Sequence, residues 1–178
     1  MKDSDTSKLY LTGDDEDWFA CDELDCVALL FSNGCPLPTS VPAAPRSEEL
    51  WSRLTNLPEL CTADLDPLFQ KEAARSRDWP AGPKYTFLSE ILEDGRRGLY
   101  VYDFEPKQWQ YKRLVIPQRP LLLSTLPRAI AHLLAQTRVT SSFASEQTFK
   151  LSITLHQGSR STSNAKSGEA GPRDGFGA

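Results

Sequence analysis

The chain has 178 residues, of which 39% are hydrophobic, and this is enough for one domain with an apolar core. The formal net charge of −4 is unevenly spread, because residues 1–25 carry nine acids against two lysines, a local balance of −7. Such asymmetry argues against nonspecific binding of nucleic acids or anionic membranes through the N-terminal part, and it is compatible with a cationic protein partner. No stretch approaches the roughly 20 apolar residues of a membrane helix, and no signal peptide is evident. These features predict a cytoplasmic protein.

The N-terminal third of the chain has the pattern of short strands. Residues 8–12 fit a strand that leads into an acidic turn at residues 13–15. Trp18–Cys21 and Cys26–Phe31 follow as two strands of a meander, because Val27, Leu29 and Phe31 alternate with Ala28 and Leu30 in an almost wholly apolar run. Four prolines between residues 36 and 45 then predict a stiff, extended connector.

Two helices are predicted next. Ser47 is a plausible N-cap of the first, which ends at Pro58. Its expected buried face consists of Leu50, Trp51, Leu54 and Leu57. The second helix is expected to open at Asp66-Pro67, a capping residue followed by proline at the first helical position, and to run to about Arg77.

Residues 85–93 fit the face of a helix capped by Gly95, with a hairpin through Asp94-Gly95 as the alternative. The clearest strand pair is Gly98–Phe104 and Trp109–Ile116, in which aromatic and β-branched residues dominate. A further helix is expected from a cap at Ser124 or Thr125 through Gln136.

The alternating residues of Thr148–Leu155 predict a last strand, and the composition after it becomes rich in Gly, Ser and Arg. The sequence therefore predicts a single α+β domain over residues 1–155, with three to four helices packed on one face of an antiparallel sheet. Residues 156–178 are predicted to be a disordered tail.

Few residues suggest chemistry. Two histidines leave little scope for acid–base or metal catalysis, and no serine lies in a Gly-x-Ser-x-Gly elbow. The cysteines match no paired Cys-x-x-Cys zinc spacing and are interpreted as buried thiols. The acidic run lacks the ligand spacing and central glycine of a calcium loop. The predicted hairpin would carry a small basic patch, formed by Arg96, Arg97, Lys112 and Arg113. We predict no metal, no cofactor and no nucleic-acid partner.

Three stretches occur in a characteristic order. The first is Trp18–Asp22 with Val27–Phe31 and Asn33–Pro38, the second is Gly98–Asp103, and the third is Tyr111–Pro117 with Pro120-Leu121 and Leu126-Pro127. This order resembles a group of small bacterial proteins, some of which are similar to immunity proteins paired with toxins. The SUKH-type immunity superfamily, also of small α+β proteins, is more distantly similar. One departure lies in the turn after Asp22, where a glycine is expected and this chain has Asp25.

The resemblance implies a non-enzymatic protein that masks the active site of a toxin. Nuclease toxins have basic clefts for phosphates, and an acidic surface would speed association with such a cleft and occlude it. We predict that Trp18 is either a desolvated anchor of this surface or a core residue that opens an apolar strand. The predicted partner-binding residues are Asp14, Asp15, Glu16, Asp17, Trp18 and Asp22.

Two other classes of function stay open. The first is a small enzyme whose site is assembled from scattered acids such as Asp22, Glu90 and Asp103. Carboxylates with separated pKa values inside one cleft would favour the enzyme. The second is a structural or scaffold subunit of a larger assembly, which a large exposed apolar patch would favour.

Overall fold

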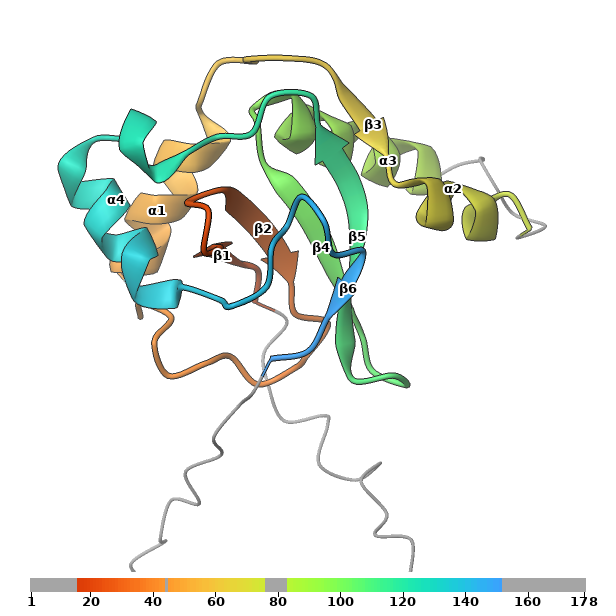
Figure 1. Ribbon diagram of the computed structural model, residues 1–178, viewed down its shortest axis with the longest axis horizontal. Coiled ribbons are helices and arrows are strands. Elements are labelled where there is room, and N and C mark those ends of the chain that lie inside the picture. Colours follow the sequence, from red (N-terminus) through yellow and green to blue (C-terminus); the bar gives the residue numbers. More distant parts are fainter. Residues whose placement is uncertain (1–15, 44, 76–82, 152–178) are drawn as a thin grey trace, which may run out of the picture.

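The computed structural model describes residues 16–43, 45–75 and 83–151 of the chain, and Figure 1 shows the arrangement of their elements. Six strands in one sheet and four α-helices form a single α+β domain within these ranges, which confirms the predicted fold class. The strands are β1 (Trp18–Cys21), β2 (Val27–Phe31), β3 (Ala63–Leu65), β4 (Tyr100–Glu105), β5 (Gln110–Pro117) and β6 (Thr148–Phe149). The predicted strand at residues 8–12 and the predicted tail lie outside the described residues.

The hairpin of β1 and β2 is confirmed and pairs Trp18 with Leu30 and Cys21 with Val27. Its turn depends on Asp22, which is fully buried and accepts hydrogen bonds from the backbone N–H groups of residues 24 and 26 through Oδ1 and of Phe143 through Oδ2. Asp25 adopts a φ of +63°, so it takes the left-handed conformation for which a glycine was expected. The prediction that Asp22 belongs to an acidic docking surface is therefore wrong, because its carboxylate is buried and hydrogen-bonded to backbone N–H groups inside the fold.

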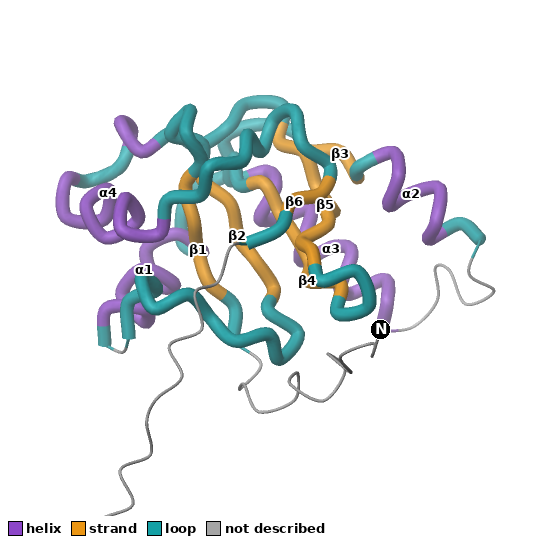
Figure 2. The backbone as a smooth tube through the Cα atoms, turned by 60° about the horizontal axis from the view of Figure 1, so that its bottom comes forward, coloured by secondary structure: helices purple, strands orange, loops and turns teal. Residues whose placement is uncertain are grey.

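The sheet has the order β1-β2-β4-β5-β3, and β6 pairs with β5 outside this path. Its pairs are antiparallel except that β2 and β4 run parallel, with Phe31 opposite Asp103. The sheet is thus mixed rather than wholly antiparallel. The reason is that the chain between β2 and β4 crosses over one face of the sheet through three helices before it returns in the same direction. Figure 2 shows the strands side by side in the middle of the domain.

The first two helices differ from prediction at their ends. Helix α1 (Arg46–Thr55) has Pro45 at its N-cap position, so Ser47 is not the cap. Leu50 and Leu54 are buried as expected, but Trp51 is 40% exposed. Helix α2 (Pro67–Ala73) begins as predicted, because Oδ1 of Asp66 accepts a hydrogen bond of 2.8 Å from the N–H of Leu68. Strand β3, which lies between these helices, was not predicted.

Helix α3 (Pro83–Arg96) confirms the helical interpretation of residues 85–93 and contradicts the hairpin alternative. Gly95 lies within this helix rather than at its cap. A Cβ atom there would lie 2.4 Å from Cγ1 of Val115 and 2.7 Å from Cβ of Ala63, so the glycine allows the helix to approach the sheet. The left-handed residue after the helix is Gly98, with a φ of +91°.

The last helix is shorter than predicted. Helix α4 (Arg128–Leu134) follows Pro127, and residues 123–125 form the separate 3₁₀-helix η2 (Leu123–Thr125), so neither Ser124 nor Thr125 caps it. A second 3₁₀-helix, η3 (Ala135–Thr137), continues from α4. Strand β6 covers two residues of the predicted last strand, and the part beyond residue 151 lies outside the described residues.

The two faces of the sheet have different covers. Helices α1 and α4 pack over β1 and β2, and α3 packs over β4 and β5, so the predicted single helical face is correct. The opposite face is aromatic, and its buried side chains include Trp18, Tyr100, Tyr102, Phe104 and Tyr111. The segment of residues 139–149 covers that aromatic face with Val139, Phe143 and Phe149.

Buried polar side chains hold this covering segment. Arg113 is 5% exposed, lies 2.9 Å from a carboxylate oxygen of Asp66, and donates to the backbone carbonyls of Phe143 and Ala144. The hydroxyl of Tyr102 donates to the carbonyls of Phe143 and Glu146. Arg113 is therefore an internal residue and does not contribute to the basic surface patch that the sequence suggested on the hairpin.

The cysteines are free thiols, and Cys21, Cys26 and Cys35 are buried as predicted, whereas Cys61 is only half-buried. Burial raises the pKa of Cys35 to about 11, and burial with the nearby Asp22 carboxylate raises that of Cys26 to about 11. These two thiols are therefore protonated and unreactive at neutral pH.

Candidate functional site

Side chains from three neighbouring strands meet at one end of the sheet on its helical face. Phe31 ends β2, and its partner in the parallel ladder is Asp103 of β4. Asp17 precedes β1, one residue beyond the pairing of Trp18 with Leu30. Because side chains alternate between faces, Asp17 lies on the same face as Phe19, and Asp103 on the same face as Val101. Two carboxylates therefore flank an aromatic ring where the apolar face of the sheet ends.

Two helices form the walls above this part of the sheet. Phe87, Glu90, Asp94 and Arg97 recur three or four positions apart on α3 and its C-terminal end, so they share one side of the helix. Trp51 and Thr55 share a side of α1 for the same reason. Helix α1 covers β1 and β2 and helix α3 covers β4 and β5, so the space between the helices is left open above Phe31.

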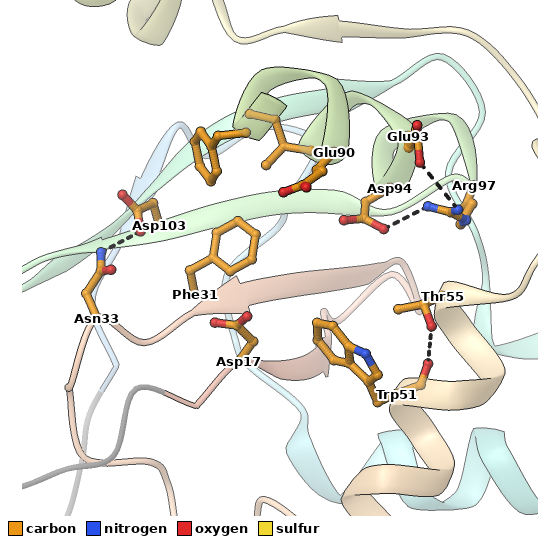
Figure 3. A pocket seen from close by; sticks show the side chains of 12 residues that line it. Asp17, Phe31, Asn33, Trp51, Thr55, Glu90, Glu93, Asp94, Arg97 and Asp103 are labelled. Carbon is orange, nitrogen blue, oxygen red and sulfur yellow. Dashed lines mark hydrogen bonds and ion pairs between the residues drawn. The ribbon is translucent and has the colours of Figure 1, made fainter. Parts of the chain in front are cut away.

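This space is a cleft of about 570 Å³, within the size range of ligand pockets. Five acidic residues and one arginine line it: Asp17, Glu90, Glu93, Asp94, Asp103 and Arg97. Figure 3 shows the carboxylates of Asp17, Glu90, Asp94 and Asp103 arranged around the ring of Phe31. We refer to this space, between α1 and α3, as the acidic cleft.

Exposed aromatic rings make up the apolar part of the acidic cleft. Trp51 is 40% exposed and its ring centroid lies 5.5 Å from that of Phe19, while Phe87 is 38% exposed and lies 5.9 Å from Phe31. These contacts hold each ring against the sheet and leave the rest of it open to solvent. Partly exposed rings beside carboxylates are the combination that binds organic cations well.

The charges at the α3 end of the cleft are partly neutralised. Nη1 of Arg97 lies 3.0 Å from Oδ1 of Asp94, and its Nη2 lies 3.8 Å from Glu93. Burial nevertheless raises the pKa of Asp94 to about 6, against the lowering effect of Arg97 and with a further rise from Glu93 and Glu90. Glu90 has no hydrogen bond or ion pair to its side chain among residues 16–43, 45–75 and 83–151. Its carboxylate is exposed and available to a partner.

The residues predicted to bind a partner fall into three groups. Asp14 and Asp15 lie outside the described residues. Glu16 and Asp17 are exposed, and Asp17 lines the acidic cleft. Trp18 is 3% exposed and its indole N–H donates to the hydroxyl of Tyr111 at 3.1 Å, so it is the core residue of the alternative interpretation and not a surface anchor.

The structure also regroups the acids of the enzyme alternative. Glu90 and Asp103 line the same cleft, whereas Asp22 is buried at the opposite end of β1. Trp51 and Phe87 were missed as site residues, because both occupy helix positions that an amphipathic pattern assigns to the core. The acidic residues that flank the apolar positions of α3 were the one sequence feature that could have indicated a site on this helix.

No helix in the described part of the chain is long and apolar enough to cross a membrane. Nor do three or more His, Cys, Asp or Glu side chains among those residues converge closely enough to hold a metal ion. Comparisons with protein-family models, curated proteins and solved structures gave no match to this chain.

Proposed function

We propose that this chain is a non-enzymatic protein-binding module, and most concretely an immunity protein that neutralises a basic toxin by docking its acidic cleft onto it. The observation that carries the proposal is the acidic cleft with two partly exposed aromatic rings, Trp51 and Phe87. Large aromatic residues supply much of the binding energy in protein interfaces. Complementary charges raise association rates and exclude wrong partners.

A nuclease is the most direct kind of toxin for this surface. Its phosphate-binding cleft must be basic, so an acidic partner competes for the same electrostatic field as the nucleic acid. Glu90 on the α3 wall and Asp17 at the end of the sheet supply exposed negative charge to the acidic cleft. The charge is concentrated in a hollow, where a protruding basic side chain of the toxin can be desolvated.

The test is capture from a lysate of the source cells with the full chain, followed by purification of the captured protein. The variant Asp17→Asn/Glu90→Gln removes two exposed charges from the cleft. Its matched control, Glu23→Gln/Asp64→Asn, removes two exposed charges elsewhere. We expect a basic partner whose nuclease activity the wild type and the control inhibit, and whose affinity for the cleft variant is about tenfold lower or worse. A partner that binds all three chains equally, or whose activity none of them inhibits, would contradict the proposal.

A carboxylate enzyme is the second candidate, because Asp94 has a pKa of about 6 in the same cleft as Glu90 and Asp103. A general acid of this kind needs a proton that it can transfer and a carboxyl group held in a fixed position. Asp94 is instead engaged by Arg97, and no hydrogen bond within the described ranges orients Glu90. Binding therefore accounts for this arrangement better. Turnover of a substrate that Asp94→Asn abolishes, in a variant that still folds, would reverse this preference.

A further inference from the structure

A second hollow adjoins the acidic cleft and shares two of its residues, Asp17 and Trp51. It has a volume of about 650 Å³. Its lining comes from residues 16–19, from the connector after β2 and from α1. Most of it is apolar, with Leu37, Val41 and Leu50 among its residues, and the carboxylates that line it are those of Glu16, Asp17 and Glu48. The indole of Trp51 thus lies between the acidic cleft and a hollow whose wall is largely aliphatic, with acids at part of its lining.

We propose that the two hollows together recognise a short segment of the partner that places an arginine side chain in the acidic cleft and an apolar side chain in the adjoining hollow. This inference rests on the proposed function and names the chemistry of the partner. Charge complementarity selects the cation, because Asp17 at the end of the sheet and Glu90 on α3 both present carboxylates to the acidic cleft. The apolar part of the adjoining hollow, beside Trp51, selects the apolar side chain of the partner segment.

Arginine fits the cleft better than other cations. Its planar guanidinium stacks on aromatic rings and binds carboxylates with several N–H donors, and it is more weakly hydrated than the ammonium of lysine. Trp51 and Phe87 offer exposed ring surface, and Glu90 offers a carboxylate without a competing partner. A metal ion is the poorer fit, because the acids of the cleft do not converge on one point.

The spacing of the two partner side chains follows from backbone geometry. In an extended segment, residues two apart point to the same side of the chain. The hollows share a wall and need not be bridged by a long connection. We therefore expect the arginine and the apolar residue to be separated by one residue, which itself points to solvent.

The first part of the test is an NMR titration of the ¹⁵N-labelled full chain with the probe peptide acetyl-Leu-Ser-Arg-amide. The signal of the Trp51 indole N–H is assigned by its loss in Trp51→Phe. We expect saturable shifts of this signal and of the amides around Glu90, with affinity in the millimolar range. Replacement of arginine by citrulline, which is neutral and nearly isosteric, should weaken binding by about tenfold. Replacement of leucine by serine should weaken it by about threefold or more.

The second part uses variants of the chain. Glu90→Gln should weaken binding of the peptide by about threefold or more, and Glu23→Gln, which removes an equal charge at the opposite end of β1, should not change it. Equal binding of the citrulline peptide, or of a third peptide with lysine in place of arginine, would overturn the guanidinium assignment. Equal binding of the serine peptide would overturn the role of the apolar hollow. Calcium chloride that shifts the same signals as strongly at matched ionic strength would overturn the choice of an organic cation.

The two proposals fail separately. If a basic partner is captured through the cleft but the peptide gives no saturable shift, the binding function stands and the arginine assignment is wrong. If the peptide binds as described but no captured protein is inhibited, the site is correct and the immunity function is wrong.

Discussion

Asp94 is predicted to destabilise the protein at neutral pH, although it forms an ion pair with Arg97. Its side chain is 15% exposed, and burial raises its pKa from 3.8 to about 6. The folded state therefore holds this proton more tightly than the unfolded state does. Protonated Asp94 therefore stabilises the folded state. This stabilisation is fully present below the pKa of Asp94 in the unfolded chain, and it is lost as the pH rises through the folded-state pKa of about 6. At about 1.4 kcal/mol per pH unit, the loss amounts to roughly 3 kcal/mol.

The variant Asp94→Asn removes this loss, because the amide is neutral and its oxygen can still accept a hydrogen bond from Arg97. We expect its free energy of unfolding to exceed that of the wild type by about 1–3 kcal/mol near pH 8 and to match it near pH 4. Urea denaturation followed by circular dichroism at a series of pH values measures this difference. Glu23→Gln, at an exposed position, serves as the control and should show no such trend. A variant less stable than the wild type at about pH 8 would refute the reasoning, because the ion pair would then outweigh the burial of the charge.

Three further changes test the packing around the sheet. Gly95→Ala should lower the free energy of unfolding by about 1–3 kcal/mol because its Cβ overlaps with Val115. In a double-mutant cycle, the same change should cost less in a Val115→Ala background, and additive losses would contradict this explanation. Arg113→Met should cost about 3–5 kcal/mol in urea denaturation, because it leaves the buried Asp66 without its partner, and a loss below 1 kcal/mol would show that the pair is dispensable. Tyr102→Phe should cost about 1–3 kcal/mol and speed hydrogen exchange in the segment before β6, whose two carbonyls lose their donor; unchanged exchange would oppose that role.

Local patterns were sufficient to predict most elements of the fold. The two hairpins follow from apolar and aromatic runs, and the start of α2 follows from Asp66 and Pro67. Helix α3 follows from the spacing of its apolar residues. In each of these elements the deciding interactions lie within one element or one hairpin. The parallel pairing of β2 with β4 was not predicted, because it joins strands almost seventy residues apart and depends on the crossover between them.

The candidate site was predicted only in part, and the failures have a common physical cause. Composition shows that a carboxylate exists but does not show whether the fold uses it. Asp22 and Asp17 belong to the same acidic run, yet three backbone N–H groups take up the first and the second reaches the cleft. Trp51 was assigned to the core because it lies beside Leu50 and Leu54 on α1. The sequence of α1 alone does not show that a cleft separates this helix from α3 and leaves Trp51 partly exposed.

The crossover also explains why negative charge is concentrated at this end of the sheet. Alternation along β1 puts Asp17 on the face that carries Phe19, and the parallel register puts Asp103 beside Phe31. Both carboxylates thus extend the helical face of the sheet beyond the part that α1 and α3 cover. The acids of α3 face the same space from above. These charges come from three separate parts of the fold, the residue before β1, helix α3 and strand β4, so their spacing is set by the packing of the sheet and the helix. A partner of the kind proposed would meet a preorganised surface. Under the proposed function we therefore expect the acidic character of the chain to act through this one cleft, so that a change in net charge elsewhere would not reproduce the effect of removing Glu90.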